Sequence, residues 1–239
     1  MIFLILFAKV LLPPDGGIVY TETNMHRLIP EPLNAISAGF FMLIALYWII
    51  KLNGFSLQSV FLSVASYILL IGSIGGVSYH ALRLYKFFIL MDWLPILLLC
   101  MMASVYFWAK IVRQWLYAAG LILIFFLIQF FIRQYLERYD NLDWAVSINY
   151  AAMAIMVIAP VFIYTFRDRS IHSRLVYYSI ACFALALFFR ESDKWHLLPV
   201  GTHFLWHTFG ALATQLMFRY VYYLDHERSA WKLKYSGQL

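Results

Sequence analysis

The sequence predicts an all-α membrane protein, a seven-transmembrane helix bundle with a functional site on the side of the membrane that holds the N-terminus. Of its 239 residues, 64% are hydrophobic and only 13% are charged. A soluble domain carries about twice that share of charged residues. Seven apolar segments, each long enough to cross a bilayer core, follow one another with short polar breaks. No linker interrupts the series, so residues 1–239 are expected to form a single domain.

The chain before the first span, residues 1–32, is expected to be a surface segment. Its apolar stretch at 2–8 is too short to span, and it lacks the basic start and small-residue cleavage site of a signal peptide. The bundle is expected over 33–224 and a tail over 225–239. The expected spans are 33–52, 56–81, 85–109, 115–132, 144–166, 174–189 and 202–224.

The net charge of +6 is spread over short loops and the tail. Nucleic acid is not an expected partner, because the chain has no basic stripe or RNA-binding motif. With the N-terminus outside, the inner loops and the tail hold the larger share of the Lys and Arg residues. This small excess predicts a multi-pass protein with its C-terminus in the cytoplasm.

Three histidines are the strongest candidates for a metal site. His203 and His207 lie four residues apart at the start of the seventh span, so a helix presents both on one face. His80 ends the second span, which places it on the same side of the membrane. Three neutral imidazoles with a fourth position left open are typical of a catalytic zinc site. Two alternatives are histidines that are hydrogen-bonded in a polar core and a haem held by an axial pair.

Asp92 lies in the first turns of the third span, on the same side of the membrane as the histidines. An ionisable residue inside a span is a functional candidate by default. Its carboxylate could deprotonate a metal-bound water or hold a ligand histidine. The alternative is an acid at the lipid headgroups. Glu191, Asp193 and Lys194, also on this side, are interpreted as a solvated loop.

An oxygen-rich group precedes the first span. It consists of Glu22, Asn24 and Glu31, followed by Asn34. Carboxylate and amide oxygens suit a hard cation such as calcium, although no EF-hand loop is present. The alternative is a solvated loop in which Asn34 caps the first helix.

These blocks, in this order, resemble the alkaline ceramidase family, within the CREST group of seven-span membrane hydrolases. The matching blocks are Tyr20-Thr-Glu22, Glu31-Pro-Leu-Asn34-Ala-Ile-Ser37, Gly75 to His80, Asp92-Trp-Leu-Pro95 and His203-Phe-Leu-Trp-His207. The resemblance implies zinc on His80, His203 and His207, with Asp92 serving the water, and calcium held by Glu22, Asn24 and Glu31. It also implies a membrane lipid as partner. The reaction would hydrolyse the N-acyl bond of ceramide or a ceramide-like lipid to a sphingoid base and a fatty acid.

Two positions depart from the family pattern. Gly76 stands where the family has a serine thought to help at the reacting centre, and neither Ser73 nor Ser78 replaces it in position. Val19 stands where the family has an acid, with Asp15 as a candidate substitute. Alternative functions are a seven-span receptor of the adiponectin-receptor type with structural zinc, and a hydrolase of another acyl lipid.

Overall fold

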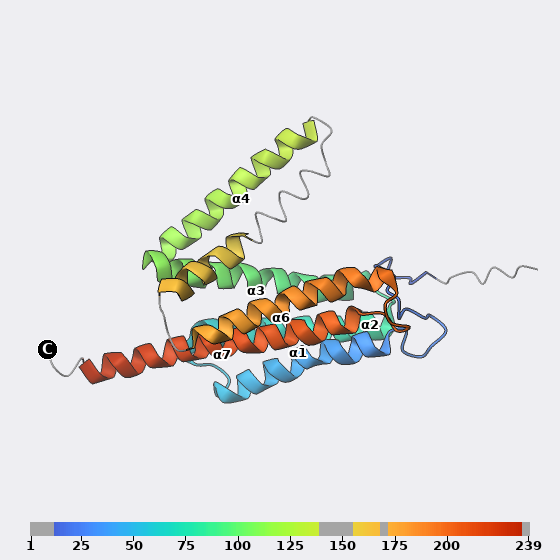
Figure 1. Cartoon of the computed structure of the whole chain (residues 1–239), viewed down its shortest axis with the longest axis horizontal. Coiled ribbons are helices and arrows are strands. Elements are labelled where there is room, and N and C mark those ends of the chain that lie inside the picture. The colour runs from blue at the N-terminus through green and yellow to red at the C-terminus, as the bar shows by residue number, and fades with distance from the viewer. Residues whose placement is uncertain (1–11, 139–154, 168–171, 236–239) are drawn as a thin grey trace, which may run out of the picture.

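The computed structural model describes residues 12–138, 155–167 and 172–235, and within these ranges the chain is helical without strands (Figure 1). The helices are α1 (Pro32–Lys51), α2 (Val60–Leu82), α3 (Lys86–Val112), α4 (Trp115–Arg138), an unlabelled helix (Ile155–Arg167), α6 (Ser173–Ser192) and α7 (His203–Tyr235). Short 3-10 turns, Leu57–Ser59 and Asp193–Trp195, precede α2 and follow α6. The predicted all-α class is therefore confirmed for these residues.

Five of these helices are long and apolar enough to cross a membrane. They are α1, α2 with its preceding turn, α3, α4 and α6. The helix at Ile155–Arg167 is shorter, and the predicted span 144–166 begins outside the described residues. The seventh predicted span lies in α7, which continues to Tyr235 through the residues expected to form a tail. The multi-pass membrane character is supported, whereas the count of seven spans and the orientation stay predictions.

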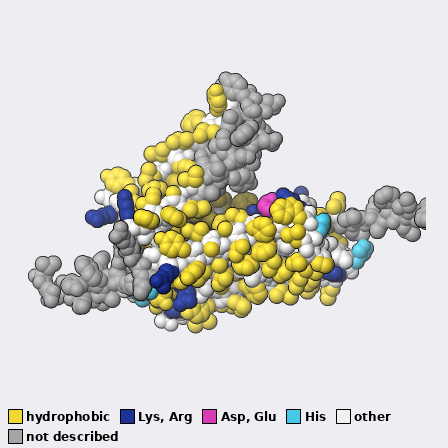
Figure 2. All heavy atoms as spheres, viewed as in Figure 1, with side chains coloured by type: hydrophobic (Ala, Val, Ile, Leu, Met, Phe, Trp, Pro, Cys, Tyr) yellow, Lys and Arg dark blue, Asp and Glu magenta, His cyan; other side chains and the backbone are white. Residues whose placement is uncertain are grey.

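The bundle brings its polar helix ends together. The starts of α1, α3 and α7 and the ends of α2 and α6 meet at one end of the molecule, where residues 12–31 form a loop (Figure 1). On the face that Figure 2 shows, hydrophobic side chains cover the middle of the bundle and the visible charged side chains lie towards its ends. A lipid bilayer around the middle would match this distribution.

A glycine face on α2 determines how closely α3 approaches. A Cβ atom on Gly72 would lie 2.9 Å from Pro95, and one on Gly75 would lie 2.5 Å from the Met91 backbone carbon. Small residues on the contacting face of a helix allow close contact between membrane helices. Since Asp92 follows Met91, this contact brings it against the turn of α2 that precedes His80.

A large apolar core lies among the helices on the side away from the loop 12–31. Trp48, Leu62, Phe107 and Tyr220 are fully buried there. The Trp48 indole N–H donates to Gln215 Oε1 at 2.8 Å, which satisfies the polar atom of a side chain that is otherwise packed against hydrocarbon. This packing holds α1, α2, α3 and α7 together and so sets the position of the histidines on α2 and α7.

Candidate metal centre

The three histidines that the sequence singles out come together. One ligand nitrogen from each of His80, His203 and His207 lies within 4.8 Å of the others, and all three side chains are buried. The centroids of the His80 ring and the two α7 rings are 5.4 and 4.9 Å apart. The arrangement could hold a metal ion. That this ion is zinc stays a prediction.

His80 is oriented by a carboxylate. Its Nδ1 lies 2.5 Å from Glu31 Oε2, in a contact where both side chains are fully buried. Its Nε2 is also buried, and no described residue hydrogen-bonds to it. A histidine that donates one ring N–H to a carboxylate presents the other nitrogen as a lone pair, which is the usual arrangement of a metal ligand.

The start of α1 orients His207 in the same way. His207 Nδ1 lies 3.1 Å from the Asn34 carbonyl oxygen and 3.0 Å from Ser37 Oγ. The Ser37 hydroxyl donates to the same Asn34 carbonyl, so its oxygen is free to accept from the imidazole. With Nδ1 carrying the proton, Nε2 is left to bind a metal.

His203 is fixed by packing and by its backbone. The Tyr20 ring stacks on the His203 ring at 3.8 Å, and burial is the main cause that raises the pKa of the Tyr20 phenol above its ordinary value. Asp193 Oδ1 accepts the backbone N–H groups of Thr202 and His203 at 2.7 and 3.0 Å, as a cap at the start of α7 does. His203 Nδ1 is a buried nitrogen with no partner among the described residues. Such orphaned nitrogens fit a bound cation.

Asp92 lies beside this centre. Its Oδ1 would be 2.6 Å from a Cβ atom on Gly76, one helical turn before His80. The missing side chain at Gly76 therefore leaves the space that the Asp92 carboxylate fills. Among the described residues, none donates a hydrogen bond to this carboxylate. Asp92 also lines a cavity, so its carboxylate is accessible to a molecule bound there.

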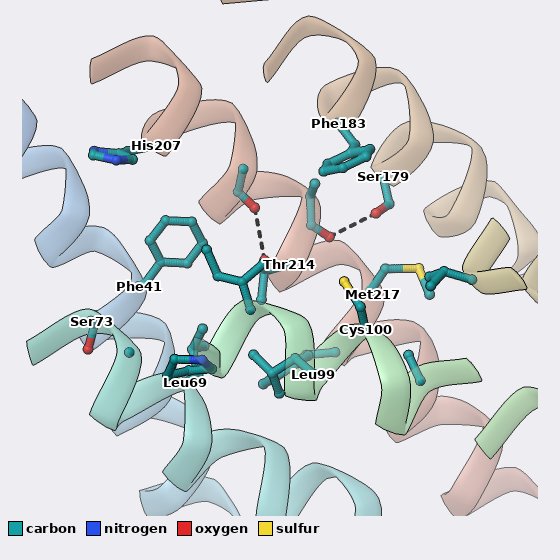
Figure 3. Close-up of a pocket in the computed structure, with 18 of the residues that line it drawn as sticks. Phe41, Leu69, Ser73, Leu99, Cys100, Ser179, Phe183, His207, Thr214 and Met217 are labelled. Carbon is teal, nitrogen blue, oxygen red and sulfur yellow. Dashed lines mark hydrogen bonds between the residues drawn. The ribbon is translucent and has the colours of Figure 1, made fainter. Parts of the chain in front are cut away.

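The cavity has a volume of about 310 Å³ and runs into the bundle from the histidine end (Figure 3). Its walls come from α1, α2, α3, the helix at Ile155–Arg167, α6 and α7, and they are mostly apolar. His207 lies at one end of the view, with Phe41 next along the cavity and Met217 and Cys100 farther in. The α7 residues that line the cavity between His207 and Val221 extend about 21 Å along the helix axis.

The residues predicted to hold calcium lie close to the histidines but are used differently. The Glu22 carboxylate accepts the backbone N–H groups of Leu33 and Asn34 at 2.7 and 2.9 Å, and so caps α1. Burial raises the pKa of Glu22 above its ordinary value of 4.5, although these two hydrogen bonds act in the opposite direction. Asn24 Oδ1 accepts the backbone N–H of His26 at 3.0 Å within its own loop.

Glu31 is the most heavily contacted of this group. Its Oε1 accepts from the Thr23 hydroxyl at 2.6 Å and from Arg83, while its Oε2 faces His80. Burial acts to raise the pKa of Glu31, but the hydrogen bonds from His80 and Thr23 and the charge of Arg83 outweigh it, so the pKa lies below 4.5. Glu31 stays ionised at neutral pH and links the surface loop to the histidine centre.

Two residues around the centre, Asp193 and Arg83, are not among the candidates that the sequence indicates. Asp193, interpreted as part of a solvated loop, is 6% exposed and also accepts the Thr21 backbone N–H at 3.0 Å. Arg83, which falls between the expected spans 56–81 and 85–109, is fully buried. Glu191 and Lys194 do form an exposed ion pair, as expected of a solvated loop. The sequence carries no local signal for this role of Asp193, because it depends on Gly201 and Thr21 being brought beside the carboxylate by the fold.

A scan of the chain against models of protein families finds no match, and neither does a search of curated protein sequences.

Proposed function

We propose that this protein is a metal-dependent hydrolase of the membrane that cleaves the N-acyl bond of ceramide or a ceramide-like lipid. The proposal rests on one structural observation, the position of the three histidines relative to Asp92 and an apolar cavity. Three buried histidines from α2 and α7 converge, and one of them, His207, lines the end of an apolar cavity that Asp92 also lines. The resemblance of the histidine and Asp92 blocks to alkaline ceramidases supports the choice of lipid.

The histidines fit zinc. His80 and His207 each engage one ring nitrogen with an acceptor from the N-terminal part of the chain, which leaves the other nitrogen as a lone pair. Zinc bound there would supply an activated water and would polarise the substrate carbonyl. Tyr20 lies over His203 and reduces the access of bulk solvent to the centre from the loop side.

Asp92 is the proposed general base and acid. Its carboxylate accepts a proton from the water that adds to the carbonyl carbon, and then delivers that proton to the nitrogen as the C–N bond breaks. The products are a free amine and a carboxylic acid. General acid–base catalysis of this kind contributes about 10² to 10⁴ in rate. With glycine at position 76, no serine hydroxyl is available there to stabilise the developing oxyanion.

The cavity is the proposed acyl-chain site. An apolar lining along one face of α7 suits a single hydrocarbon chain whose carbonyl lies at the histidine end. Binding of the remote chain would place the reacting bond beside Asp92, so that binding energy is used for orientation.

The test is elemental analysis of detergent-purified protein, followed by assay of N-acyl and O-acyl lipids with and without a chelator. We expect about one zinc per chain and release of fatty acid from N-acyl sphingoid lipids that stops when zinc is removed. Hydrolysis of esters alone would assign another acyl lipid as substrate. Bound zinc without turnover of any acyl lipid would favour the receptor alternative, and a Soret absorbance band would favour haem.

A further inference from the structure

The resemblance to ceramidases places calcium among Glu22, Asn24 and Glu31, but these residues do not fit that ion. Calcium in proteins takes six to eight oxygen ligands. Both carboxylates and the Asn24 amide oxygen already accept hydrogen bonds from protein donors. Asn34 Oδ1 is a buried oxygen without a described partner, but one oxygen does not make a calcium shell.

A guanidinium group lies in the middle of this region instead. Arg83 is 0% exposed, and its Nε and Nη2 donate to the two carboxylate oxygens of Asp15 at 2.8 and 3.1 Å. Nη2 also donates to the Ile18 carbonyl at 2.9 Å, and Nη1 donates to Glu31. Two carboxylates and one backbone carbonyl therefore surround the positive charge with oxygen, as they would surround a bound cation. The bidentate contact with Asp15 matches the planar fork of an arginine.

The end of α2 delivers this charge. Arg83 is the residue after the last turn of α2, and its φ of 53° reverses the chain so that the side chain points back towards the surface loop. The guanidinium carbon lies 4.6 Å from the Tyr79 ring centroid, a distance at which a cation is attracted to the ring face. Asp15 in turn accepts the Gly17 N–H at 2.8 Å, which fixes the turn that positions it.

We infer that Arg83 is the resident cation of this protein, tying the loop 12–31 to the end of α2 in place of calcium and positioning His80 through Glu31. Glu31 connects the two functions, because one oxygen faces Arg83 and the other faces His80. Arg83 is thus a positioning residue, and the protein organises its histidine centre without calcium. This inference rests on the histidines being a metal centre and not on the proposed amidase reaction.

The test uses the full chain in detergent with free zinc held constant by a zinc buffer. The first measurement is binding of radioactive calcium by equilibrium dialysis, with the melting temperature recorded with and without millimolar calcium. We expect no stoichiometric binding and no shift. One calcium per chain with a raised melting temperature would overturn the inference, and this result needs no variant.

The second measurement compares Arg83→Ala with Arg113→Ala. Arg113 follows α3 in the same left-handed conformation, with φ 61°, but is exposed, so it controls for the backbone effect of the substitution. Loss of one partner from a buried ion pair should lower the melting temperature on the order of 10 °C in Arg83→Ala. Loss of an outer partner of a metal ligand should weaken zinc binding about 10- to 100-fold, measured by chelator competition.

Millimolar calcium should restore part of this affinity in Arg83→Ala, because Asp15, Glu31 and the Ile18 carbonyl are then open to an added cation. If Arg83→Ala does not fold, Arg83→Lys keeps the charge and loses the fork, and it should weaken zinc binding to a smaller extent. An Arg83 variant that binds zinc as tightly as Arg113→Ala would overturn the positioning role. Neither measurement involves lipid turnover, so failure of the amidase proposal would leave both results standing.

Discussion

The Asp92 carboxylate lies over Gly76, with its Oδ1 2.6 Å from where a Cβ atom on that glycine would be. The space is too small for both a side chain at position 76 and this position of the carboxylate. A glycine is therefore needed at position 76 for the observed geometry of Asp92.

Replacement of Gly76 by alanine or serine should reduce lipid hydrolysis at least ~10-fold, because the added Cβ displaces the proposed base. Zinc content should be unchanged. The matched control is Gly120→Ala, since a Cβ atom there meets nothing within 4 Å and should cost no activity. Turnover of Gly76→Ser at or above that of the unmodified protein would mean that a hydroxyl at this position assists the reaction instead.

Asp92→Asn should keep zinc and lose turnover. The amide preserves the shape of the side chain but cannot accept the proton, so the rate should fall about 10² to 10⁴. Zinc per chain and fatty-acid release are the two measurements. Asp225→Asn serves as control, because that carboxylate accepts from Tyr106 at the far end of α7. An Asp92→Asn variant with unimpaired turnover would remove Asp92 from the mechanism.

Substitution of any one of His80, His203 and His207 by alanine should lower zinc content well below one per chain and abolish hydrolysis. His226→Ala is the control, since its Nδ1 contacts the Tyr222 carbonyl within α7, remote from the centre. Elemental analysis of the purified variants checks this expectation. Full zinc occupancy in all three alanine variants would show that the ion binds elsewhere.

Asp193→Ala should destabilise the protein on the order of 3 kcal/mol, because the backbone N–H groups of Thr21, Thr202 and His203 lose their acceptor. Denaturant or thermal unfolding in detergent measures the change. Glu191→Ala is the control, since that carboxylate is 66% exposed and pairs only with exposed Lys194 among the described residues. If the two variants were equally stable, Asp193 would have no stabilising role and would be a residue of a solvated loop, as the sequence predicted.

Met217→Trp should shift the acyl-chain preference to shorter chains without loss of zinc. Met217 lines the cavity about 15 Å along α7 from His207, so a larger side chain there shortens the space for hydrocarbon. Relative rates on a series of N-acyl chain lengths measure the effect. Leu212→Trp, at an exposed position of α7, is the control. An unchanged chain-length profile would place the acyl chain outside this cavity.

The sequence by itself predicted the membrane class, most helix positions and a shared side of the membrane for the three histidines. Length and hydropathy decide which segments are helical in a bilayer, and the alternation of the seven predicted crossings puts the end of the second span on the same side of the membrane as the start of the seventh. The spacing of His203 and His207 on one helical face needs no further information. Asp92 is also a candidate from the sequence alone, because it is an ionisable residue within a predicted span.

Only the tertiary structure decided how the polar groups around the histidines are paired. Arg83 and Asp193 look like loop residues in the sequence. Arg83 pairs with Asp15 and Glu31, whereas Asp193 accepts from the backbone of Thr21, Thr202 and His203. These pairings depend on where the loop 12–31 folds against the bundle. A carboxylate can hold a metal, cap a helix or pair with a guanidinium, and its sequence neighbours do not distinguish these uses. The difference lies in which donor is brought within 3 Å of each oxygen, and that is set by packing between segments far apart in the chain.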